Sequence, residues 1–183
     1  MAEKNLDFDT VIDRTHTNSL KYDFAVQRGK PKDVLPLWVA DMDFQVSSYI
    51  QEALSGNVAH GIFGYSEVEG SYFEAVAGWM SRHYGWNVEE TWLVKTPGIV
   101  FALAQAVRAF TEPGDAVLLQ QPVYYPFSQV IRDNGRKIVD NTLVQGEDGR
   151  YRIDFTDFEE KIRSAHVKLF FLCNPHNPVG RVW

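Results

Sequence analysis

Three short loops carry the residues whose types and spacing could do chemistry. The first loop, Thr96-Pro97-Gly98, leads into an apolar segment that starts with Ile99 and Val100. The first amides of a helix have no partner within the helix, and together with the helix dipole they can bind an anion such as a phosphate. Gly98 would let a phosphate approach the backbone closely. The alternative is an ordinary helix start with proline in its first turn.

The other two loops offer an aromatic ring and a side-chain amide. Tyr124 lies between Pro122 and Pro126, where it could stack on a planar ligand or pack as a wedge in the core. Asn177 lies in a turn between two prolines. It could donate a hydrogen bond to a ligand oxygen or satisfy its own turn, which is the commoner role of asparagine. Taken alone, each residue favours the structural role.

The elements that must position these loops alternate between strands and helices. Expected strands cover residues 91–95, 116–119, 137–144 and 167–172, and expected helices cover residues 99–110 and 126–133 and start at Ser48, Ser71 and Thr156. Buried apolar strands joined by short connections predict an α/β domain with a mostly parallel sheet. Ligands of such sheets bind at the carboxyl ends of the strands, where the three loops begin.

Other segments give more specific expectations. Residues 6–32 are polar and predict an extended arm, and residues 35–39 predict a short strand. Gly56 could end the first helix. The helix over residues 99–110 has no polar face, so we expect it to be buried on most sides.

Composition excludes several classes of protein. The net charge of −6 gives no basic patch for nucleic acid and no polybasic membrane anchor. The single cysteine, Cys173, excludes an intrachain disulfide framework and indicates a reducing compartment. The first residues lack the pattern of a signal peptide, and no apolar run is long enough to span a bilayer. We therefore expect a cytoplasmic protein without a metal site.

Four motifs together resemble one family. The run over residues 174–181, Asn-Pro-His-Asn-Pro-Val-Gly-Arg, is similar to the signature of class I/II aminotransferase-like enzymes, which use pyridoxal 5'-phosphate (PLP). The segments 13–23, 37–44 and 121–127 resemble the MalY/PatB branch, which contains cystathionine β-lyases and related C–S lyases. The resemblance extends from residue 9 to residue 183. It implies PLP fold type I and β-elimination of a sulfur-containing amino acid to pyruvate, ammonia and a thiol.

The resemblance also implies roles for individual residues in binding PLP. The amides of Gly98, Ile99 and Val100 would hold the cofactor phosphate. Tyr124, the candidate catalytic residue of this chain, would stack on the pyridine ring. Asn177 would donate a hydrogen bond to the phenolic oxygen of the ring.

Three further residues receive roles outside the cofactor ring. Tyr65 would reach across a homodimer interface to the phosphate in the partner subunit, although its glycine-flanked sequence alone favours a surface aromatic. The backbone at Val39 and Ala40 would line the substrate pocket. The same resemblance divides the chain into an N-terminal arm with a small-domain segment, residues 1–45, and the N-terminal part of the large PLP-binding domain, residues 46–183.

The family's remaining active-site residues are expected beyond residue 183. They are the Schiff-base lysine, the aspartate that faces the pyridine nitrogen and the arginine that binds the substrate carboxylate. We therefore expect this chain to be an incomplete, inactive half with one side of its sheet exposed. An aminotransferase of the same fold and a non-catalytic regulatory role remain alternatives, and the sequence does not identify the amino-acid substrate.

Overall fold

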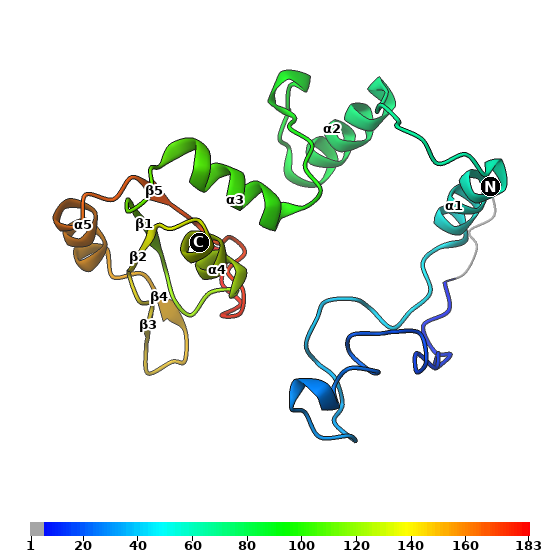
Figure 1. Cartoon of the computed structure of the whole chain (residues 1–183), viewed down its shortest axis with the longest axis horizontal. Helices are drawn as coiled ribbons and strands as arrows, with labels where there is room; N and C mark the ends of the chain where they lie inside the picture. The colour runs from blue at the N-terminus through cyan, green and yellow to red at the C-terminus, as the bar shows by residue number, and fades with distance from the viewer. Residues whose placement is uncertain (1–5) are drawn as a thin grey trace. The chain divides into compact units, whose positions relative to one another are not determined.

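The computed structural model describes residues 6–183 and divides the chain into two compact units. Unit 1 is Met1–Glu69 and unit 2 is Gly70–Trp183. Figure 1 shows the course of the chain through each unit. The expected domain boundary after residue 45 concerns the domains of a longer protein, and it stays a prediction.

Unit 1 contains little regular structure. It holds a 3-10 turn, η1 (Val26–Arg28), and one helix, α1 (Ser48–His60). The expected strand over residues 35–39 is wrong, because a strand needs a hydrogen-bonded neighbour and the described part of unit 1 contains no strand. The expected helix end at Gly56 is also wrong. Glycine costs only about 1 kcal/mol inside a helix, and α1 continues to His60, where Gly61 caps it with a left-handed φ of 73°.

The sheet of unit 2 is parallel and has the order β2-β1-β5. Its central strand is β1 (Ala116–Leu119), flanked by β2 (Lys137–Asp140) and β5 (Leu169–Phe170). In register, Val117 pairs with Ile138 on one side and with Leu169 on the other. This confirms the predicted α/β class and parallel sheet.

The expected strand over residues 137–144 is divided in the structure. The pairing of β2 with β1 ends at Leu119 and Asp140, because β1 itself ends there. The chain then forms β3 (Val144–Gln145), which pairs antiparallel with β4 (Tyr151–Arg152). A change of partner therefore ends β2 before the end of the predicted strand.

Unit 2 contains four helices and a 3-10 turn among its described residues: α2 (Gly70–Tyr84), η2 (Glu90–Trp92), α3 (Ile99–Phe110), α4 (Pro126–Asp133) and α5 (Phe155–Ser164). The expected strand over residues 91–95 is wrong, since local bonds from Trp92 N to Glu89 O (3.0 Å) and Leu93 N to Glu90 O (3.1 Å) form η2 instead. The cap of α5 is Asp154 rather than Thr156, because the Asp154 side chain accepts the first free amides.

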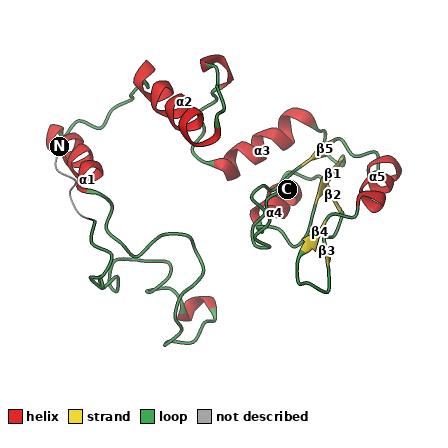
Figure 2. Ribbon diagram, turned by 180° about the vertical axis from the view of Figure 1, so that it is seen from behind, coloured by secondary structure: helices red, strands yellow, loops and turns green. Residues whose placement is uncertain are grey.

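The core lies on both faces of β1. Val117 and Leu119 form one buried cluster with Val107 of α3 and Val130 of α4. Leu118 is fully buried and, by strand alternation, faces the opposite side. On β5, the Phe170 ring contacts Phe158 of α5 with centroids 5.1 Å apart. Figure 2 shows the strands between α5 and the helices α3 and α4.

Helix α3 is less buried than its sequence predicts. Val107 is its one buried residue, and Leu103, Ala104 and Ala106 pack against the core from the same region. Ile99 at its start is exposed. The expectation of burial on most sides is therefore wrong for the part of the chain described, because α3 packs along one face only.

Candidate functional site

The first candidate loop ends at the start of α3. Gly98 is the N-cap, with φ 138° and ψ 163°, and no side chain caps the helix. Its carbonyl accepts the first helical bond from Ala102 N at 3.1 Å and a bond from Thr96 Oγ1 at 3.1 Å. A Cβ atom added to Gly98 would meet no other atom within 4 Å. The space in front of the helix start is therefore open, and the backbone angle requires glycine.

The second and third loops are joined by a backbone hydrogen bond. The amide of Tyr124, after β1, donates to the carbonyl oxygen of Asn177, after β5, at 2.8 Å. β1 and β5 are neighbours in the sheet, so their carboxyl ends bring the two loops together. The structure thus places side by side two residues that are 53 positions apart in the sequence.

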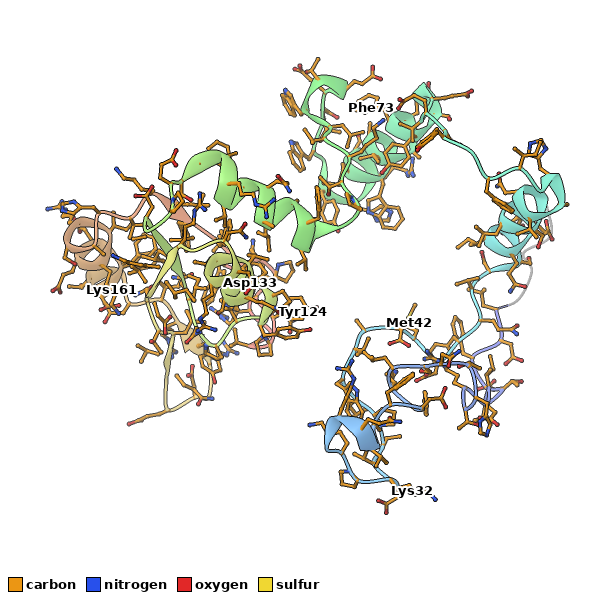
Figure 3. The ribbon with its side chains drawn as sticks, in the orientation of Figure 1. Lys32, Met42, Phe73, Tyr124, Asp133 and Lys161 are labelled. Carbon is orange, nitrogen blue, oxygen red and sulfur yellow. The ribbon has the colours of Figure 1, made fainter. Side chains whose placement is uncertain are left out.

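Both side chains at this junction are accessible. The Tyr124 residue is 40% exposed, and its ring meets Tyr125 edge-on with centroids 5.2 Å apart. It is not the buried core wedge that its sequence context favoured. Asn177 is also exposed, and its backbone N–H donates to the Cys173 sulfur at 3.4 Å. Figure 3 labels Tyr124 at the edge of unit 2.

A buried histidine lies between these loops, and sequence analysis gave it no role. His176 is 2% exposed. Its Nε2 lies 3.1 Å from the carbonyl oxygen of Pro122, and its Nδ1 accepts a bond from Trp183 Nε1 at 3.1 Å. The one signal in the sequence is its place inside the Asn-Pro-His-Asn-Pro run.

The remaining predicted residues belong to unit 1 and are described within that unit. Val39 has a left-handed φ of 61°, a costly conformation for a β-branched side chain. Ala40 follows it on an exposed segment. Tyr65 is fully exposed in the chain between α1 and α2.

An ionic cluster follows the strained residue Val39. Arg14 forms ion pairs with the carboxylates of Asp41 and Asp43, the second at 2.5 Å. Lys21, which is 5% exposed, donates to Asp41 O at 3.0 Å and to Asp43 Oδ2 at 3.2 Å. The hydrogen bonds from Arg14 lower the pKa of both carboxyl groups from the ordinary value.

In unit 2, a network of hydrogen bonds and an ion pair surrounds the buried side chain of Asn141. Asn141, fully buried, donates to Asp157 Oδ2 at 2.7 Å and accepts from Gln120 Nε2 at 2.8 Å. Lys161 forms an ion pair with Asp157 at 2.8 Å, and this contact lowers the pKa of that carboxyl group. The network fixes α5 beside the end of β1.

None of the helices among residues 6–183 is both long enough and apolar enough to cross a bilayer.

Comparison with known proteins identifies close relatives. Cystathionine beta-lyase PatB of Bacillus subtilis (strain 168) is 47% identical over 178 residues, which cover 97% of this chain and 46% of that protein. Protein MalY of Escherichia coli (strain K12) is 32% identical over 178 residues, 97% of this chain and 45% of that protein. The chain therefore spans about half the length of the curated relatives it matches.

A solved structure supports the same relationship. The PLP-bound C-S lyase from Staphylococcus hominis superimposes with a TM-score of 0.86 and 34% identity, covering 97% of this chain and 44% of that one. The resemblance to the MalY/PatB branch is confirmed by these relatives. The family model "Aminotransferase class I and II" matches residues 32–183. On these grounds the chain belongs to the aminotransferase class I and II family.

Proposed function

We propose that the complete protein is a PLP-dependent C–S β-lyase. In this reaction an amino acid with sulfur on its β-carbon, together with water, gives a thiol, pyruvate and ammonia. The observation that carries the proposal is the hydrogen bond between Tyr124 N and Asn177 O, which joins the two loops whose side chains we expect to contact the cofactor ring. Similarity to a cystathionine beta-lyase and to a PLP-bound C-S lyase supports this choice.

The residues present fit the cofactor. The open space at Gly98 and the first amides of α3 suit a phosphate group. The accessible Tyr124 ring suits the face of a pyridine ring, and the exposed Asn177 side chain has an N–H donor for its phenolic oxygen. When bound, PLP supplies an electron sink that makes the α-proton of the substrate acidic.

The protein's own contribution is geometry. Gly98 leaves the backbone accessible, so the amides of Ile99 and Val100 can donate to phosphate oxygens without a side chain between them. Tyr124 would hold the ring in one plane, and the Asn177 side chain would fix its rotation within that plane. Together these three contacts would orient the substrate bonds that must break.

We extend the proposal to the substrate pocket and to the partner subunit. The backbone at Val39 and Ala40 would line the pocket for the sulfur-containing amino acid, and the strain at Val39 is typical of a functional position. We expect a homodimer in which the exposed Tyr65 reaches the phosphate in the partner subunit. A cytoplasmic location stays a prediction from the sequence.

The test uses the complete protein saturated with PLP and supplied with cystathionine. We expect pyruvate and free thiol in equal amounts without any keto-acid acceptor. Turnover that requires a keto acid and yields no thiol would contradict the lyase proposal and favour an aminotransferase.

A pair of adjacent tyrosines provides the matched control for the site. Tyr124→Ala should raise the Kd for PLP about fivefold, because a stacked aromatic contact contributes on the order of 1 kcal/mol. Tyr125→Ala removes the ring that meets Tyr124 edge-on but no expected contact with PLP, so it should raise the Kd by less than Tyr124→Ala does. Equal effects of the two substitutions would contradict the role given to Tyr124.

A further inference from the structure

His176 connects the two loops that carry Tyr124 and Asn177. We call residues 120–125 the β1 loop and residues 171–183 the β5 loop. The His176 side chain belongs to the β5 loop but reaches Pro122 O in the β1 loop at 3.1 Å. It lies one residue before Asn177 in sequence, and its target lies two residues before Tyr124.

The chemistry of the two partners determines the protonation of the imidazole ring. A carbonyl oxygen only accepts, so Nε2 of His176 must carry the hydrogen that is donated to Pro122 O. An indole N–H only donates, so Nδ1 must be bare to accept from Trp183 Nε1 at 3.1 Å. Only the neutral tautomer with hydrogen on Nε2 satisfies both contacts. A doubly protonated ring would direct an N–H group at the indole donor.

The backbone around His176 is also fixed. Its amide donates to Arg181 O at 2.6 Å, and its carbonyl accepts from Gly180 N at 2.8 Å. The Trp183 amide donates to Asn174 Oδ1 at 3.1 Å, and the indole ring meets the imidazole edge-on with centroids 5.6 Å apart. The imidazole therefore extends from a closed turn, and its position is set before it reaches the β1 loop.

We propose that His176 is a positioning residue that couples the β1 loop to the β5 loop in a single tautomer. This inference rests on the proposed function for its consequence, because the coupled loops carry the residues that would contact the ring and its oxygen. With the bond from Tyr124 N to Asn177 O, the imidazole gives the loops a second, side-chain connection. The imidazole thus joins the two loops at Pro122, in addition to the backbone bond at Tyr124.

The first experiment measures the coupling without cofactor. In the complete, cofactor-free protein, ¹⁵N NMR should show a protonated Nε2 and an unprotonated Nδ1 in His176. His176→Phe keeps a flat ring but removes both bonds, and we expect exchange of the Tyr124 amide hydrogen to accelerate about tenfold. The opposite tautomer, or unchanged exchange in the Phe variant, would overturn the inference.

The second experiment measures the consequence for the cofactor. His176→Phe should raise the Kd for PLP about tenfold and alter the circular dichroism of bound PLP, which reports ring orientation. His176→Gln keeps an N–H donor that can reach Pro122 O, so it should restore both readouts to within about threefold of the wild type. The exposed His60 provides the control, and His60→Phe should change neither readout.

The two proposals can fail separately. If the wild-type protein binds no PLP, the proposed function fails, and the amide exchange and tautomer still decide the role of His176. If the protein binds PLP and the Phe variant shows wild-type affinity and dichroism, the coupling inference fails and the proposed function stands. Loss of affinity without rescue by glutamine would also overturn the inference, since it would indicate a general packing role.

Discussion

The two units of this chain are held together by different interactions. In unit 2, an apolar cluster packs against one face of β1, and Val117, Leu118 and Leu119 are all fully buried. Among the described residues of unit 1, only Ser19, Lys21, Ala25 and Pro36 are buried, and two of these are polar. Hydrogen bonds between side chains and the backbone replace the core there.

Asp23 illustrates how unit 1 keeps its shape. Its carboxylate accepts the amides of His16 at 2.8 Å, Thr17 at 3.1 Å and Ser19 at 2.9 Å. The bond from the His16 amide is the largest cause that lowers the pKa of this carboxyl group. A segment without helix or strand can therefore hold a defined loop, but its stability depends on charge, whereas that of unit 2 depends on packing. Both kinds of scaffold support residues of the proposed site.

The largest effect should come from the core of unit 2. Ile131→Ala removes a side chain that is fully buried in α4, so we expect a loss of about 3 kcal/mol in the free energy of unfolding. Urea unfolding of the complete, cofactor-free protein measures this change. Val144→Ala, at an exposed position of β3, should cost less than about 0.5 kcal/mol. Similar losses for the two variants would show that packing does not dominate in unit 2.

A smaller and local effect should follow in unit 1. Arg14→Met breaks both ion pairs with Asp41 and Asp43, and we expect amide exchange in residues 13–23 and 39–43 to accelerate severalfold. Exchange in β1 should stay unchanged. Arg163→Met breaks the exposed pair with Glu159 on α5 and should change little. Acceleration spread evenly over both units would contradict a local ionic scaffold.

The pH dependence should separate the units further. The pKa values of Asp23, Asp41 and Asp43 are lowered in the folded chain, so their stabilising contribution is complete above the ordinary carboxyl pKa of about 4. It is lost as the pH falls below that value through the lowered pKa of the folded state. Amide exchange, corrected for its intrinsic pH dependence, should therefore accelerate in unit 1 as the pH falls below about 4.

This pH prediction has an internal control. In the Arg14→Met variant the pKa values of Asp41 and Asp43 should return toward the ordinary value, so the acid transition should shift upward in pH. An acid transition that is identical in the wild type and the variant would mean that Arg14 does not stabilise these carboxylates.

Sequence signals located the elements that carry their own boundaries. The helix over residues 126–133 and the strand over residues 116–119 were predicted with the bounds found in the structure. Proline opens the helix at Pro126, and Gly135, with a left-handed φ of 73°, follows its end. Such signals act within a few residues, so a sequence displays them in full.

Strands were predicted less well because their partners are distant in the chain. Residues 35–39 and 91–95 have apolar sequences typical of strands, and neither segment forms one. The strand that begins at Lys137 ends where β1 ends, which only the pairing reveals. Strand length is thus decided by the neighbouring strand, not by the segment itself.

The sequence also shows only part of the candidate site. The types and order of Gly98, Tyr124 and Asn177 are properties of the sequence, and motifs around them identified the family. The sequence does not contain the contact from Tyr124 N to Asn177 O or the position of His176 between Pro122 and Trp183. Those contacts exist because parallel pairing of β1 with β5 brings two distant strand ends together, and long-range pairing is a property of the folded chain.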